Sequence, residues 1–157
     1  MTQLSRRAAI ALAVLPPVYA SHPHWVKFFV DGGNVMSKSR GRRATVRGVY
    51  WSMRCEDGSA EPVTIRQRDI TQFSTNNDAE WLALREALTY AVAHHADVPI
   101  IIYSDSQLVV KQFNNQWRTK IARHFRLHQE CKNLTAQLKF VILQWVPREV
   151  SVAKLGH

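Results

Sequence analysis

One short segment limits the possible folds of this chain more than any other. Residues 98–103 form a run of mostly β-branched apolar side chains, and Asp105 follows the run closely. A run of this kind is typical of a strand buried on both faces, as in a sheet that helices cover on each side. The segment therefore favours an α/β fold over a one-sided antiparallel sheet.

Three further strands are predicted before this segment, and they follow one another closely. Residues 25–30 form an apolar run that ends at the turn-forming Asp31–Asn34, and residues 48–53 and 63–70 are the next two strands. Residues 56–59 supply a hairpin turn between them. The polar and basic residues 35–47 are predicted to form a loop. Short connections of this kind indicate an antiparallel meander.

Helices are predicted in the second half of the chain. Residues 74–77 can cap a helix over residues 78–94, whose Trp81, Leu84, Leu88 and Ala91 follow one apolar face. A short helix is expected over residues 106–115, a longer one over residues 120–137, and a last strand over residues 140–146. The order β-β-β-α-β-α-α-β predicts a five-stranded mixed sheet, with three antiparallel strands plus parallel strands, flanked by helices.

The charge of the chain indicates an anionic partner. Its 157 residues contain 21 Lys and Arg against 12 Asp and Glu, a net charge of +9. A basic balance of this size favours nucleic acid first and an acidic membrane surface second, although a basic surface can also serve solubility alone. The two cysteines are too few for a disulfide framework and favour a reducing compartment.

The first 20 residues differ from the rest of the chain. A short basic lead is followed by the uncharged apolar residues 8–20, which is the layout of a signal peptide; a disordered leader is the alternative. We therefore predict a leader over residues 1–20 and a single domain over residues 21–157. The only charged side chains in residues 1–20 are those of Arg6 and Arg7. Most of the net positive charge therefore lies in residues 21–157.

Three carboxylates are placed where a catalytic site would form. Asp31 ends the first predicted strand, Asp105 follows the fourth, and Glu80 lies in the first turn of the helix that precedes the fourth. Sites in open α/β sheets form beyond the carboxyl ends of strands. Each acid also has a structural interpretation: Asp31 as a turn residue, Glu80 as a partner of the helix dipole, and Asp105 as an N-cap. Together they would repel one another unless a hard cation such as Mg²⁺ or Mn²⁺ lay between them.

Four segments carry a resemblance to a known family. Residues 25–33 (WVKFFVDGG) resemble the first-strand motif of type 1 ribonuclease H, and residues 75–80 (TNNDAE) resemble its helix motif. Residues 100–107 (IIIYSDSQ) resemble its third motif, and residues 145–149 (WVPRE) the segment before its fourth. The resemblance covers roughly residues 24–157. It implies a ribonuclease H-like fold.

The resemblance also implies an activity and a set of site residues. The family hydrolyses the RNA strand of an RNA–DNA hybrid with two Mg²⁺ ions, for which Mn²⁺ can substitute, about 4 Å apart. Matching motifs make Asp31, Glu80 and Asp105 the catalytic metal ligands. The positions that match substrate-binding residues of the family lie near these acids or later in the chain. They are Gly32, Gly33, Asn34, Thr75, Asn76, Asn77, Ser106, Gln107, Trp117 and Arg148. Asn77 has a second interpretation as a helix cap.

The chain departs from the family pattern at the fourth carboxylate. No acid follows Glu149, and Lys154 or Leu155 falls about where the family has Asp. Ser151 or His157 is the candidate replacement ligand, and a neutral ligand would weaken the second metal. The family's basic, Trp-containing insertion is at most reduced to residues 117–120 with Arg123, His124 and Arg126. A second basic segment, residues 37–43, is a candidate phosphate contact.

Several functions fit these observations. The first is a metal-dependent endoribonuclease that acts on hybrids, as a monomer in the cytoplasm, or exported if the leader is a signal peptide. The second is a catalytically impaired module of the same fold that binds hybrid or double-stranded nucleic acid. A nuclease with another substrate, and a secreted or membrane-attached basic protein with structural acids, are the remaining alternatives. The folded domain itself is not expected to enter a membrane, and no obligate protein partner is evident.

Overall fold

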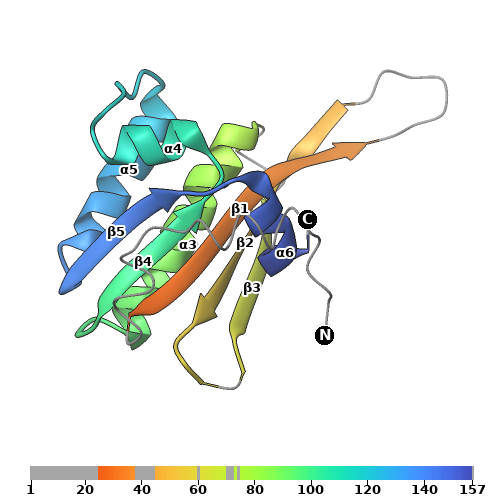
Figure 1. Ribbon diagram of the computed structural model, residues 1–157. Coiled ribbons are helices and arrows are strands. Elements are labelled where there is room, and N and C mark those ends of the chain that lie inside the picture. Colours follow the sequence, from red (N-terminus) through yellow and green to blue (C-terminus); the bar gives the residue numbers. More distant parts are fainter. Residues whose placement is uncertain (1–24, 38–44, 60, 70–72, 74, 157) are drawn as a thin grey trace.

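The computed structural model describes residues 25–37, 45–59, 61–69, 73 and 75–156 (Figure 1). Three of the sequence predictions fall wholly or mostly outside these ranges. They concern the leader over residues 1–20, the basic segment 37–43 beyond Ser37, and the candidate ligand His157. These three stay predictions.

The described residues form a five-stranded mixed sheet in the order β3-β2-β1-β4-β5. Strand β1 pairs antiparallel with β2 and parallel with β4, while β3 is antiparallel to β2 and β5 is parallel to β4. The predicted fold class is therefore confirmed. The strands are β1 (Val26–Ser37), β2 (Thr45–Glu56), β3 (Val63–Asp69), β4 (Pro99–Ser104) and β5 (Phe140–Trp145).

Helices cover both faces of this sheet, and each face has its own apolar cluster. The larger cluster contains Phe28 and Val30 of β1 together with Trp81, Leu84 and other residues of α3. The smaller one joins Phe29 and Tyr103 to residues of α6 on the opposite face. Burial on both sides explains the uninterrupted apolar sequence of β4, and each fully buried large side chain contributes about 1.5–3 kcal/mol. The helices are α3 (Asn76–His94), α4 (Gln107–Phe113), α5 (Ala122–Thr135) and α6 (Arg148–Leu155).

Helix α3 begins two residues earlier than predicted, because Thr75 is its N-cap. The Thr75 side chain accepts a hydrogen bond from the Asp78 amide, and the Asp78 carboxylate accepts one from the Thr75 amide, each at 3.1 Å. This reciprocal pair is a capping box. Glu80 consequently lies in the second turn of the helix, not in the first.

The same Asp78 side chain joins α3 to α5. It is fully buried, and its Oδ1 lies 2.6 Å from Arg123 Nε and 2.6 Å from His124 Nε2. A buried carboxylate is tolerated only when charged or polar partners satisfy it, and here Thr75, Arg123 and His124 supply them. Sequence analysis assigned no role to Asp78, because a single acid in a first helical turn gives no sign of its distant partners.

Two other predictions need correction. Residues 35–47 were expected to form a loop, whereas β1 continues to Ser37 and β2 begins at Thr45, with Met36 opposite Val46. These ends form a two-stranded ribbon beyond the rest of the sheet, held by backbone pairing that requires no apolar pattern. Helix α6 was not predicted at all, because its eight residues are too few to show a clear helical period.

We expect Asp78→Ala to lower the free energy of unfolding by about 3 kcal/mol, because it leaves the buried His124 and the Thr75 amide without their acceptor. Urea denaturation measures the change. Asp97→Ala is the matched control, since Asp97 is exposed in a turn and its loss should cost less than about 0.5 kcal/mol. Equal losses in both variants would contradict the structural role assigned to Asp78.

Candidate active site

The pairing between β1 and β4 brings two of the predicted acids together. The last parallel pair is Val30 with Ser104, and Asp31 and Asp105 are the next residues of their chains. Adjacent strands lie about 4.8 Å apart, so the two side chains leave the sheet side by side. The sequence predicted that Asp31 ends its strand, but β1 continues past it to Ser37. Asp31 lies at the level where β4 ends and only the β1–β2 ribbon continues. Nor does Asp105 cap α4, because Ser106 takes that role.

A glycine lets the third acid approach the other two. A Cβ atom on Gly32 would lie 2.5 Å from the carbonyl carbon of Ala79, so only glycine permits this contact between β1 and α3. Because Ala79 precedes Glu80, the close approach sets Glu80 beside Asp31. One carboxylate oxygen from each of Asp31, Glu80 and Asp105 lies within 4.8 Å of the others.

The electrostatics of this cluster are unfavourable for three negative charges. Burial raises the pKa of Asp31, and burial followed by the charge of Asp31 raises the pKa of Asp105. The pKa of Glu80 lies well above its usual range, because of burial and then the charges of Asp31 and Asp105. The side chains of Asp31 and Glu80 also act on each other: Asp31 raises the pKa of Glu80, while Glu80 lowers that of Asp31 and so offsets part of the effect of burial there. Arg148 offsets part of the charge, with Nη1 3.4 Å from Asp105 Oδ2.

These residues fit a divalent cation. Hard oxygen ligands in a compact group suit Mg²⁺ or Mn²⁺, and a cation there would offset the burial and repulsion that raise the pKa values of these acids. Glu80 Oε2 supports this, because it is buried and has no hydrogen-bond partner among the described residues. An unsatisfied buried oxygen costs free energy, which coordination would recover.

Ser151 of α6 lies beside Asp105. Its buried side chain hydrogen-bonds to Asp105, which offsets part of the rise in the pKa of that carboxyl. Neither Lys154 nor Leu155, which the family pattern placed at the fourth carboxylate, lies there. Lys154 Nζ binds Glu56 Oε2 at 2.9 Å, and Leu155 is part of the apolar cluster on the α6 face.

Most of the predicted substrate-binding residues lie near the acids. Thr75 caps α3, and the exposed Asn76 and Asn77 form the first turn of that helix, which also carries Glu80. Ser106 caps α4 directly after Asp105, and Gln107 is exposed beside it. Gly33 and Asn34 continue β1 beyond Asp31. Arg148 begins α6 with its side chain 65% exposed, so the guanidinium that contacts Asp105 also faces solvent.

Trp117 lies farther along the surface, after α4. Its side chain is 44% exposed, and Lys111 Nζ lies 4.7 Å from the ring centroid. It lines a cavity of about 540 Å³ with Asn77, Arg118 and Lys120. The cavity therefore connects the first turn of α3 to the basic residues that follow α4.

One neighbour of the acids was missed by sequence analysis. Tyr50 of β2 stands opposite Gly33 of β1, and a Cβ atom on Gly33 would lie 2.6 Å from its hydroxyl oxygen. Burial and the charge of Asp31 raise the pKa of Tyr50. No signal in the sequence marked it, because a tyrosine within a strand is ordinarily a packing residue.

A second group of reactive residue types does not form a catalytic site. Cys55 Sγ lies 3.8 Å from His95 Nε2, and His95 Nε2 lies 4.0 Å from Asp57 Oδ2. Burial and then the charge of Asp57 raise the pKa of the Cys55 thiol to about 12, which keeps it protonated and unreactive. Burial likewise raises the pKa of Cys131 to about 12.

The sheet order, the flanking helices and the three-acid cluster define the ribonuclease H-like class. The family model described as reverse transcriptase-like matches residues 31–154, which is most of the chain. The chain therefore belongs to the reverse transcriptase-like family and is a domain of ribonuclease H type.

Two curated mycobacterial proteins are similar to part of this chain. The bifunctional protein Rv2228c of Mycobacterium tuberculosis is 33% identical over 75 residues, which are 48% of this chain and 20% of that protein. The uncharacterized protein Mb2253c of Mycobacterium bovis matches to the same extent. The aligned region thus spans about a fifth of these curated relatives.

Solved structures extend the similarity to most of the domain. The N-terminal RNase H domain of Rv2228c has a TM-score of 0.64 at 24% identity, over 82% of this chain and 88% of that chain. RNase H1 of Halobacterium salinarum has a TM-score of 0.62 at 27% identity, over 80% and 88%. LC11-RNase H1, solved in complex with an RNA/DNA hybrid, has a TM-score of 0.64 at 18% identity, over 82% and 90%. Among the residues described here, no helix combines the length and apolar character needed to cross a membrane.

The raised pKa values of the cluster predict how stability depends on pH. Carboxyls whose pKa is higher in the folded chain bind protons more readily when folded, so without a cation they cost stability above the folded pKa. This cost disappears as the pH falls below the ordinary carboxyl range. We therefore expect Asp31→Asn to raise the melting temperature at pH 7 in EDTA, by roughly 3 °C for each kcal/mol relieved.

The same measurement tests the cation site. Mg²⁺ or Mn²⁺ should raise the melting temperature of the unaltered protein, more at pH 8 than at pH 5, because protons compete for the carboxylates. Asp31→Asn should remove most of this increase, whereas Asp97→Asn should keep it. If neither cation changes the melting temperature of the unaltered protein, the prediction of a cation site at these acids is wrong.

Proposed function

We propose that this protein is a metal-dependent endoribonuclease that hydrolyses the RNA strand of RNA–DNA hybrids. The observation that carries the proposal is the convergence of Asp31, Glu80 and Asp105 at the end of β4 in a ribonuclease H-type fold. Hydrolysis of a phosphodiester needs neutralisation of charge at phosphorus more than it needs a protein nucleophile. A cluster of acids in a basic protein meets that need, since it concentrates cations where a polyanion binds.

Each member of the cluster has a part in this reaction. Asp31 contributes from the sheet, Asp105 from the strand end, and Glu80 from the helix, so that the three would hold divalent cations from different directions. Two bound Mg²⁺ ions, or Mn²⁺ in their place, would activate a water molecule and stabilise the leaving oxygen. Arg148 lies at the solvent side of the cluster and would contact the phosphate as it enters. Ser151 would be a weak, neutral fourth ligand.

The surroundings of the cluster suit a substrate with two strands. Asn76, Asn77 and Gln107 are exposed on the helices beside the acids and offer amide donors and acceptors to the 2′-hydroxyl groups, by which proteins distinguish RNA from DNA. The cavity between Asn77 and Trp117 suits the second strand, because an exposed tryptophan can stack on a sugar or base and Lys120 can bind its phosphates.

The compartment and oligomeric state form part of the same proposal. Cys55 and Cys131 are both free and buried, as suits a reducing compartment such as the cytoplasm. A monomer that needs no protein partner is the simplest arrangement for this surface. Export remains the alternative if residues 1–20 are a signal peptide, and mass spectrometry of the cellular protein would decide between them.

One observation favours a second candidate function, a module that binds hybrids without cutting them. Ser151 provides a hydroxyl where the family pattern has a carboxylate, and Lys154 is bound to Glu56 instead of approaching the acids. A site with three acids holds its second cation more weakly than one with four. Binding without cleavage would be the consequence if that cation is not retained.

A labelled RNA–DNA hybrid distinguishes the two functions. We expect the RNA strand to be cut with Mg²⁺ or Mn²⁺ and to remain intact in EDTA. Asp31→Asn and Asp105→Asn should each reduce cutting at least about a hundredfold, because the cations lose a charged ligand, while hybrid binding persists. Asp97→Asn should cut normally. Binding without cleavage in both metals would establish the second function, and equal cutting of duplex DNA would indicate a different substrate.

The proposal also predicts a gain of activity. Ser151→Asp places a fourth carboxylate beside Asp105, so we expect cleavage to reach half its maximum at a several-fold lower Mg²⁺ concentration. Ser151→Asn is the matched control, because it has the same size without the charge. A Ser151→Asp protein that folds, shown by circular dichroism, but needs as much Mg²⁺ as the unaltered protein would argue against this position as the fourth corner.

A further inference from the structure

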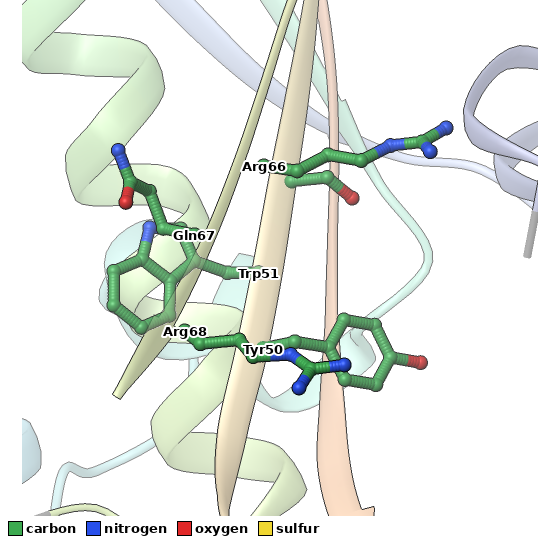
Figure 2. Close-up of a pocket in the computed structure, with 6 residues that line it drawn as sticks. Tyr50, Trp51, Arg66, Gln67 and Arg68 are labelled. Atoms are coloured by element: carbon green, nitrogen blue, oxygen red, sulfur yellow. The ribbon is translucent and has the colours of Figure 1, made fainter. Parts of the chain in front are cut away.

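A polar strip runs across the sheet beside the acid cluster, on the face that α6 partly covers. Antiparallel pairing sets Arg66 of β3 opposite Ser52 of β2, and Ser52 opposite Asp31 of β1. Two residues farther along each strand, Arg68 is opposite Tyr50, and Tyr50 is opposite Gly33. Residues that are paired in this way point to the same face. Figure 2 shows Tyr50, Arg66 and Arg68 on one side of β2 and β3, with Trp51 and Gln67 on the other.

The charge of this strip changes sign over a short distance. Acids stand on β1 and after β4, the neutral phenol of Tyr50 follows on β2, and a guanidinium comes next on β3. Arg68 lies two strand spacings from β1, which is about 10 Å. Tyr50, Arg66 and Arg68 line a cavity of about 390 Å³ on these strands.

The two arginines of the strip differ in what they bind. Arg66 Nη2 donates a 3.0 Å hydrogen bond to the Leu155 carbonyl and so closes the end of α6. Arg68 is exposed, and within the described part of the chain its guanidinium forms no hydrogen bond or ion pair. An exposed guanidinium next to a site for a polyanion suits a phosphate group.

Tyr50 is suited to the position between the acids and Arg68. Its hydroxyl lies over Gly33, two residues after Asp31, where the absence of a side chain on β1 leaves space for it. A cationic side chain at this position would pair with Asp31 and compete with the divalent cations. A phenol donates a hydrogen bond without that competition, and its raised pKa keeps it protonated as a donor near neutral pH.

We propose that Tyr50 and Arg68 form a phosphate-binding subsite that holds the RNA strand one or a few nucleotides from the phosphate at the acid cluster. The ligand is a phosphodiester of the strand being cut, and its identity as RNA rests on the function proposed above. The Tyr50 hydroxyl and the Arg68 guanidinium donate hydrogen bonds to its oxygens. The subsite sets the position of the strand relative to Asp31.

The first test measures binding of an RNA–DNA hybrid in EDTA over a series of salt concentrations. Arg68→Gln should weaken binding several-fold and reduce the slope of log K against log salt by about one, the value for a single lost phosphate contact. Lys139→Gln removes the same charge at the opposite end of the sheet, before β5, and should change neither quantity. Tyr50→Phe keeps the ring over Gly33 and removes the hydroxyl, so it should weaken binding with the slope unchanged.

The second test locates the contact on the strand. A neutral methylphosphonate linkage is placed at one RNA-strand position at a time, in the unaltered protein and in Arg68→Gln. One position near the cluster should weaken binding to the unaltered protein and have little effect in Arg68→Gln, because the two changes remove the same interaction. Additive effects at every position, or an unchanged slope in a folded Arg68→Gln protein, would overturn the subsite.

These measurements separate the subsite from the proposed catalysis. Cutting of the hybrid by the unaltered protein together with an unchanged salt slope in Arg68→Gln would leave the nuclease proposal intact and remove the subsite. Binding that depends on Arg68, without cutting in either metal, would support the subsite and favour the binding module. A wild-type protein that binds no hybrid would overturn both.

Discussion

The register between β1 and β4 is the constraint on which the rest of the site depends. Parallel pairing stops at Val30 and Ser104, so the next residue of each strand, Asp31 and Asp105, leaves the sheet at the same level. A shift of one residue would turn Asp31 to the α3 face and bury Val30 on the other. The apolar clusters on both faces of β1 resist such a shift, because Phe28 and Val30 belong to one and Phe29 to the other. Packing of the core thereby positions the acids.

The site is a compromise between stability and charge. Burial raises the pKa values of all three acids, neighbouring carboxylates raise those of Glu80 and Asp105 further, and Arg148 and the hydroxyl of Ser151 offset part of these shifts. A fourth acid at Ser151 would add repulsion in the absence of cations, while a hydroxyl adds little. A neutral group at this position therefore avoids that repulsion, and under the function proposed above it would hold a second cation less tightly than an acid. Tyr50 follows the same principle, since it places a donor near the acids without a charge.

The sequence was sufficient to predict the sheet, its long helix and the three acids, because these depend on local patterns. A buried run before Asp105 indicates a central strand, and residues 75–80 carry both a cap and an acid. The features that were missed depend on distant partners. Asp78 owes its role to Arg123 and His124, which lie some 45 residues away, and Tyr50 owes its role to the pairing of β2 with β1. Helix α6 is too short to show a period, so the position of Ser151 could be suggested but not located.

The contact between Gly32 and Ala79 has a consequence for the choice of ion. Backbone atoms of β1 and α3 approach closely there, so the main chains that carry Asp31 and Glu80 are held at a fixed separation. Mg²⁺ takes oxygen ligands at about 2.1 Å, whereas Ca²⁺ needs about 2.4 Å and more ligands. At the proposed site this separation would favour the smaller ion, because only the side-chain rotamers of the acids could adjust to a larger one.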